Sequence, residues 1–96
     1  MNLSFHPEAR MEFISKIDYY ESCRLGLGYD FATEVRSTIE TIRRFPKAWP
    51  VLEGHIRRSM VHRFPYGIIY AEDDDAVLIL AIMHLHRDPE YWKHRL

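Results

Sequence analysis

Residues 76–83 read Ala76-Val77-Leu78-Ile79-Leu80-Ala81-Ile82-Met83, and every side chain in this stretch is apolar. A continuous apolar run of this length is typical of a central strand whose two faces are both covered. The acidic residues 72–75 directly before it indicate a turn. We therefore predict that residues 76–83 form the central strand of a sheet and that the rest of the fold is arranged around it.

Further strands are indicated on the N-terminal side of this run. Residues 67–71 and 56–62 are rich in residues that favour extended structure, and Phe64-Pro65 between them indicates a turn. Near the start of the chain, Leu3 and Phe5 alternate with polar neighbours, which predicts one more short strand.

Two amphipathic helices are predicted between the first strand and the others. In residues 7–24 and 29–44, apolar side chains recur every three or four positions, at Ala9, Phe13, Ile17 and Tyr20 and at Phe31, Val35, Ile39 and Ile42. Gly26 and Gly28 should end the first helix, and Pro46 should stop the second before a loop over residues 46–50. A helix hairpin follows from this spacing.

The expected order is thus β-α-α-β-β-β, followed by a short C-terminal helix over residues 89–94, where Pro89 and Glu90 suit a first helical turn. This is an α+β fold with a largely antiparallel sheet packed by an N-terminal helix hairpin. A chain of 96 residues has room for one core, so we expect a single domain spanning residues 1–96.

Composition narrows the class of protein. Cys23 is the single cysteine, which excludes an intramolecular disulfide and favours a reducing compartment. The first ten residues are too polar for a signal peptide, and no apolar run approaches the length of a membrane span, so we expect a cytoplasmic protein without a membrane partner. The net charge is −1, yet cations and histidines concentrate after Glu53, so a local basic surface can form.

The hairpin and the C-terminal segment carry a resemblance to a known family. Arg57-Arg58, residues 63–70 (RFPYGIIY), the apolar strand and residues 84–92 (HLHRDPEYW) occur in the order found in toxins of the RelE/ParE superfamily. Each piece is short, but the ordered combination spans essentially the whole chain. The resemblance implies a RelE-like fold and a toxin of a type II toxin-antitoxin system. It also implies a cognate antitoxin whose C-terminal segment wraps around the toxin in a hetero-oligomer.

Topology predicts where the functional side chains gather. In consecutive antiparallel hairpins, the end of one strand, the start of the next and the end of the third meet at one edge of the sheet. We therefore expect Arg63, Tyr66, His84 and Arg87 to converge there, offering cations and aromatic faces. The alternative is that the arginines pair with acids such as Asp88 and that Tyr66 only packs.

Two activities within the superfamily compete for this surface. RelE-like members cut mRNA on the ribosome, which here would use His84, His86 or Tyr91 as acid or base and Arg58, Arg63 or Arg87 to stabilise charge. Such enzymes carry basic residues at positions that correspond here to Gly67 and Leu85.

Gly67 and Leu85, which stand where RelE-like enzymes carry basic residues, favour the ParE-like activity. That activity is the poisoning of DNA gyrase by binding. The predicted target-binding residues share cationic or aromatic character and are Arg58, Arg63, Tyr66, His84, Arg87, Tyr91 and Trp92. A ribosome-dependent mRNA endoribonuclease is the alternative, with His84, Arg63, Arg87 and Tyr91 as its catalytic residues.

Other signals are weaker. His84 and His86 share one face of an extended segment, but no third metal ligand has a natural spacing, and we expect neither a metal nor a cofactor. Cys23 has no histidine partner in sequence and is expected to be a small core or interface residue rather than a nucleophile. If the helix hairpin covers just one face of the sheet, alternate residues of the apolar strand are left exposed on the other face, where an amphipathic partner segment could dock.

Overall fold

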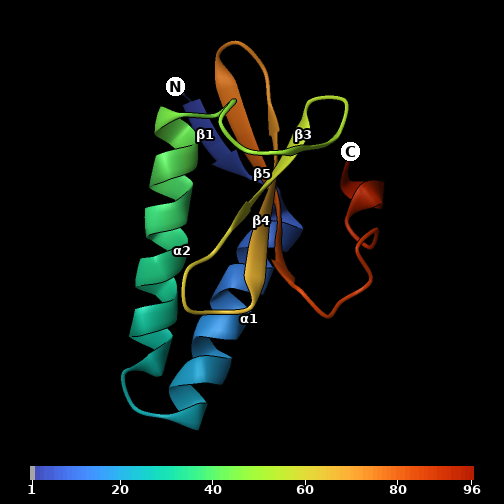
Figure 1. Ribbon diagram of the computed structural model, residues 1–96. Coiled ribbons are helices and arrows are strands. Elements are labelled where there is room, and N and C mark those ends of the chain that lie inside the picture. Colours follow the sequence, from blue (N-terminus) through green and yellow to red (C-terminus); the bar gives the residue numbers. More distant parts are fainter. Residues whose placement is uncertain (1) are drawn as a thin grey trace.

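The computed structural model describes residues 2–96 and contains a five-stranded sheet with a helix hairpin on one face (Figure 1). In chain order the elements are β1 (Asn2–Phe5), α1 (Pro7–Cys23), α2 (Leu27–Arg44), β2 (Val51–Glu53), β3 (Ile56–Met60), β4 (Tyr66–Glu72), β5 (Ala76–His84) and a 3-10 turn, η1 (Lys93–Arg95). The strands lie in the order β1-β5-β4-β3-β2. The α+β class and the central place of the apolar strand are confirmed, since β5 lies between β1 and β4.

The sheet is mixed rather than wholly antiparallel. β1 pairs with β5 in parallel, with Asn2 opposite Ala76 and Phe5 opposite Ile79, whereas all other pairs of strands are antiparallel. β1 ends at Phe5, so the edge of β5 beyond Ile79 has no neighbouring strand. This free edge becomes important for the candidate site.

The helix hairpin turns on two glycines. Gly26 adopts a left-handed backbone with φ of 88°, which glycine tolerates without strain. A Cβ at Gly28 would lie 2.5 Å from the carbonyl oxygen of Ile17, so the close approach of α2 to α1 requires a glycine there. The Glu21 carboxylate accepts hydrogen bonds from both glycine N–H groups. Because these contacts nucleate the turn, α2 begins at Leu27 and includes Gly28, two residues earlier than the predicted start.

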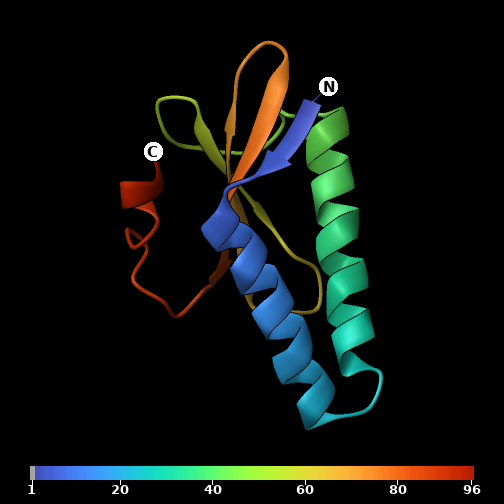
Figure 2. The same cartoon turned by 180° about the vertical axis from the view of Figure 1, so that it is seen from behind.

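The main core lies between the hairpin and one face of the sheet. It buries the predicted helix residues Ala9, Phe31, Val35, Ile39 and Ile42, and it partly buries Phe13, Ile17 and Tyr20. Strands β4 and β5 supply the facing side chains, among them Tyr66, Ile68 and Val77. Figures 1 and 2 show both helices on this side of the sheet, with the C-terminal segment on the other.

The second face of the sheet is covered in part by the C-terminal segment. Trp92, which is 2% exposed, packs in a cluster with Ile69, Leu80 and Met83. The pairing of β4 with β5 shifts between Ile69 and Tyr70, and this bulge places the consecutive residues Leu80 and Ala81 in the same cluster. The expectation of an exposed face therefore holds for only part of it, because the tail folds back.

Two segments differ from the predicted boundaries. The C-terminal segment forms turns and the short η1 rather than a helix over residues 89–94, because Trp92 and Arg95 are fixed by tertiary contacts with the sheet and α1. Val51–Glu53 adds an edge strand after the predicted loop. No helix in residues 2–96 combines the length and apolarity that a membrane crossing requires.

Candidate functional site

Tyr66 and His84 meet at one end of the sheet, as the topology predicts. They are paired in the register of β4 with β5, and their rings lie 5.1 Å apart in an edge-to-face arrangement. The His86 ring lies 5.3 Å from that of His84, whose Nδ1 accepts a hydrogen bond from the His86 N–H. The two histidines therefore form one partly exposed group at the exit of β5.

Tyr66 itself is a core residue. Its side chain is 1% exposed and packs on Phe31 and Tyr20. Burial raises the pKa of its hydroxyl, with the neighbouring Tyr20 adding to the effect. Tyr66 can thus position His84, but a partner protein cannot reach it while the core is intact.

Arg63 is held apart from this group. It has a positive φ of 72°, and its guanidinium faces α2, 3.7 Å from an Asp30 oxygen and 3.8 Å from a Glu34 oxygen. It also lies over the ring of Phe64. Asp30 and Glu34, rather than the residues at the β5 exit, are therefore the partners of this cation.

Arg87 lies on Tyr91. The guanidinium carbon is 3.7 Å from the centre of the tyrosine ring, and one guanidinium nitrogen is 3.8 Å from the Glu12 carboxylate. The Arg87 side chain remains 55% exposed, so a large part of its donor surface faces solvent. This stack of cation on aromatic ring is the most accessible cationic feature among the predicted site residues that the structure brings together.

Glu12 connects Tyr91 to the free edge of β5. The Tyr91 hydroxyl donates to one oxygen of Glu12 at 2.7 Å, and the other oxygen accepts from the backbone N–H of Ile82 at 3.0 Å. Burial and this hydrogen bond raise the pKa of Tyr91. Tyr91 is therefore held in its neutral form, with its proton committed to Glu12.

Arg95 completes the connection. Its side chain is 5% exposed, pairs with Glu12 through both Nη atoms, and donates to the Leu80 carbonyl oxygen at 2.8 Å. Burial acts against its charge, but the hydrogen bonds and the charge of Glu12 outweigh burial and raise the pKa of Arg95. Glu12 and Arg95 thus satisfy backbone groups of β5 that a neighbouring strand would otherwise pair.

Sequence reasoning did not single out Glu12 or Arg95 as site residues. Glu12 lies between the apolar residues of α1, and Arg95 lies 83 residues further along the chain. The sequence holds no local signal for a contact at that separation. The one usable hint was that β1 is too short to pair with all of β5.

Arg58 and Trp92 lie on the second face of the sheet. The aliphatic stem of Arg58 crosses Gly67, where an added Cβ would lie 3.1 Å from the Arg58 Cδ. The space of a side chain at position 67 is thus filled by an arginine from β3. Trp92 is buried and donates its Nε1–H to the Pro89 carbonyl oxygen at 2.7 Å, which identifies it as an anchor of the C-terminal segment.

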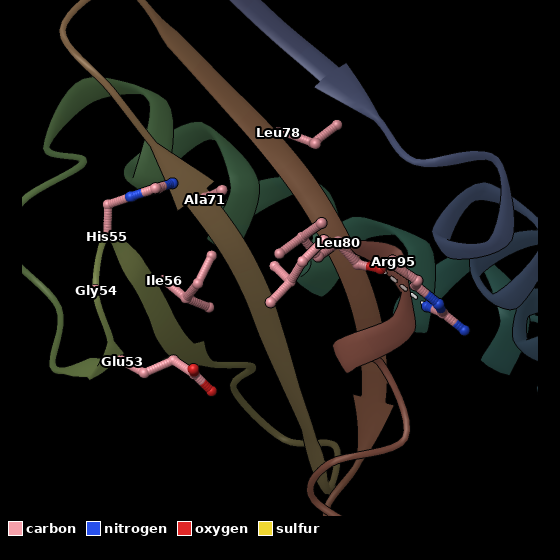
Figure 3. A pocket seen from close by; sticks show the side chains of 9 residues that line it. Glu53, Gly54, His55, Ile56, Ala71, Leu78, Leu80 and Arg95 are labelled. Carbon is pink, nitrogen blue, oxygen red and sulfur yellow. Dashed lines mark hydrogen bonds between the residues drawn. The ribbon is translucent and has the colours of Figure 1, made fainter.

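An apolar groove remains open beside this segment (Figure 3). Its volume is about 450 Å³, and its apolar lining includes Ile56, Ala71, Leu78 and Leu80 from the sheet. Figure 3 shows Arg95 at one side of the groove, directed at β5. This groove is the part of the second face that the tail leaves uncovered.

Two of the predicted catalytic residues are engaged away from the histidines at the β5 exit. The proton of Tyr91 is committed to Glu12, and the Arg63 guanidinium is directed at α2. Within residues 2–96, no three histidine, cysteine or acidic side chains are grouped so that they could hold a metal ion. The β5 exit offers the partly exposed pair of histidines and the stacked Arg87. We term the residues His84, His86, Arg87 and Tyr91 the β5-exit surface.

Comparison with known proteins identifies relatives. The family model described as the ParE toxin of type II toxin-antitoxin system, parDE, matches residues 3–89. Among solved structures, the chain is similar to one from the chromosomal ParDE TA system from P. aeruginosa, with 16% identity and a TM-score of 0.64. The match covers 90% of this chain and 97% of that one, and at this identity it shows a shared fold. No curated protein sequence matches significantly.

Proposed function

The chain belongs to the ParE toxin family of type II toxin-antitoxin systems, and from this premise we propose that it arrests growth by binding and poisoning DNA gyrase in the cytoplasm. One observation carries the choice of a binding mechanism. Of the four residues that the ribonuclease alternative would use, Arg63 faces carboxylates on α2 and the Tyr91 hydroxyl donates to Glu12, which leaves only His84 and Arg87 without a committed proton or a partner on α2.

The β5-exit surface is the contact that we propose for the target. Arg87 supplies an exposed guanidinium that is already ordered by its stack on Tyr91, so less side-chain entropy is lost when it binds. Arginine and aromatic side chains are also the residue types that dominate binding energy at protein interfaces. An acidic or polar patch of the target would match this surface.

Membership of the family implies a ParD antitoxin as the cognate partner. We propose that an apolar segment of this antitoxin occupies the groove lined by Ile56, Ala71, Leu78 and Leu80. The groove offers an apolar floor next to the C-terminal segment, which suits a side chain of an amphipathic partner. Occupation there would place the antitoxin close to the segment that carries Tyr91.

Purified gyrase provides the direct test. Addition of the protein should inhibit supercoiling and trap cleaved DNA, and induction in cells should cause filamentation and a DNA damage response. The Arg87→Ala variant should lose both effects. Intact supercoiling together with codon-positioned cuts in mRNA would instead establish the ribonuclease activity. One observation supports the ribonuclease alternative. The Arg58 stem crosses Gly67 and so brings a cation near the position at which RelE-like enzymes carry a basic residue.

A further inference from the structure

The Glu12 carboxylate accepts four hydrogen bonds, and all of their donors lie outside helix α1. Its oxygens accept from the Ile82 N–H, the Tyr91 hydroxyl and two nitrogens of Arg95, at distances between 2.7 and 3.0 Å. Its side chain is 14% exposed. A carboxylate at this depth is costly unless it is fully paired, so its position is tightly fixed by these donors.

We infer that Glu12 is a positioning residue for target recognition, which fixes Tyr91 and the Arg87 stacked on it in the geometry that the target meets. The inference deepens the proposed function and rests on it only in assigning the target contact to Arg87. Glu12 itself is too deep to form that contact.

The aromatic ring of Tyr91 is the link between Glu12 and Arg87. On one side the Arg87 guanidinium carbon lies 3.7 Å from the ring centre, and the Arg95 guanidinium carbon lies 5.0 Å from it. The hydroxyl of the same ring is tied to Glu12 at 2.7 Å. A tyrosine tied at its hydroxyl is restrained from swinging to another χ1 rotamer, so the ring stays in place beneath Arg87.

Charge gives Glu12 a second effect on Arg87. Two guanidinium groups lie close to the ring of Tyr91, at 3.7 and 5.0 Å from its centre, and their like charges repel. The Glu12 carboxylate lies 2.9 Å from Arg95 and 3.8 Å from Arg87, and therefore offsets this repulsion. Without its charge, we expect Arg87 to leave the ring and to sample other rotamers in solvent.

Only an acceptor serves all of these partners. Each oxygen of Glu12 faces two donors, one from Arg95 and one from either Ile82 or Tyr91. A glutamine at this position would direct its own N–H groups at one of these pairs and lose its bond to Arg95 there, together with the Ile82 bond in one orientation, whereas the Tyr91 hydroxyl could turn to accept in the other. Glu12→Gln is thus nearly identical in shape and removes the charge and part of the network.

Glu8→Gln provides the matched control. Glu8 also lies on α1 and also pairs with Arg95, at 2.7 Å, but its side chain is 50% exposed and its other partner is His94. No contact links Glu8 to Arg87 or Tyr91 in the described part of the chain. Loss of the Glu8 charge therefore perturbs Arg95 and His94 but leaves the bond of Glu12 to the Tyr91 hydroxyl and its contact with Arg87 in place.

The test is a double-mutant cycle on growth arrest, with potency defined as the intracellular toxin concentration that halves the growth rate. We expect Glu12→Gln to weaken potency on the order of tenfold in the wild-type background and to have no further effect in Arg87→Ala. Glu8→Gln should stay within about twofold of wild type. Equal losses from Glu12→Gln in both backgrounds would indicate a merely structural role and overturn the inference, as would full potency of Arg87→Ala.

Tyr91→Phe keeps the inference testable if Glu12→Gln folds poorly. It removes only the hydroxyl that Glu12 holds, should weaken potency in the wild-type background, and should cause no further loss in Arg87→Ala. Wild-type potency of Tyr91→Phe would contradict the inference. Growth arrest does not presuppose the target, so a parallel supercoiling assay distinguishes failure of the gyrase proposal from failure of the role of Glu12.

Discussion

Replacement of Trp92 by alanine distinguishes an anchor of the fold from a contact with the target. A buried tryptophan removes about 200 Å² from solvent, and at about 25 cal/mol per Å² this corresponds to an upper value of ~5 kcal/mol. Measured losses for such truncations are about 3 to 5 kcal/mol. Because Trp92 is 2% exposed, we expect Trp92→Ala to lower the free energy of unfolding by about 4 kcal/mol. For a domain of this size, that loss lowers Tm by roughly 20 °C.

Urea unfolding followed by circular dichroism measures this loss, with Trp92→Phe as the matched control. Phenylalanine keeps an aromatic ring against Leu80 and Met83 and forfeits the hydrogen bond to Pro89, so it should lose only about 1 to 2 kcal/mol. A Trp92→Ala variant that loses less than about 1 kcal/mol of stability but no longer arrests growth would refute the reasoning. Trp92 would then act as a target contact.

Three further predictions follow from the site and the core. Arg87→Ala should weaken growth arrest by about tenfold or more. The guanidinium of Arg63 faces α2, so Arg63→Ala should change growth arrest by less than about twofold. Similar dose-response curves for the two variants would contradict the proposed surface. Burial raises the pKa of Tyr70 from its ordinary value of 10.0 to about 12, and it also raises the pKa of Tyr66. The stabilisation by these buried neutral tyrosines is therefore complete below pH 10 and is lost as the pH rises above it. At pH 11, the raised pKa of each tyrosine should lower the free energy of unfolding by about 1.4 kcal/mol. Urea unfolding midpoints at pH 9 and pH 11 measure this loss. Tyr70→Phe should reduce the pH dependence, and an unchanged dependence would exclude Tyr70 as its source. Leu78→Glu should weaken binding of the ParD antitoxin in calorimetry while leaving growth arrest intact, and an unchanged affinity would place the antitoxin elsewhere.

The elements of the fold were predictable wherever a local pattern specifies them. The apolar run in β5 and the three- to four-residue spacing in α1 and α2 each need only neighbouring residues to be recognised. Strand β2 has just three residues and all of them are exposed, so it carries no periodicity that could reveal it. The C-terminal segment has a proline and an acid that suit a helix start, but Trp92 and Arg95 gain more from contacts with distant residues than a helical turn provides.

The candidate site was predictable only in part, for a related reason. Strand pairing places His84 opposite Tyr66, and that follows from the hairpin alone. The direction of a long side chain does not follow from its position. Arg63 is adjacent to the hairpin turn in sequence, yet carboxylates on α2 draw its guanidinium to the helix side.

The first and last segments of the described chain contact one another, so the proposed target-binding surface needs both of them. β1 and α1 emerge from the ribosome first, but the strand that pairs with β1 and the donors that saturate Glu12 come from β5 and from residues after it. Until Tyr91 and Arg95 have emerged, the backbone of β5 beyond Ile79 lacks its hydrogen-bond partners, and Arg87 has no tyrosine ring on which to stack. We therefore expect the proposed target-binding surface to form only after the C-terminal segment has folded back onto α1 and β5.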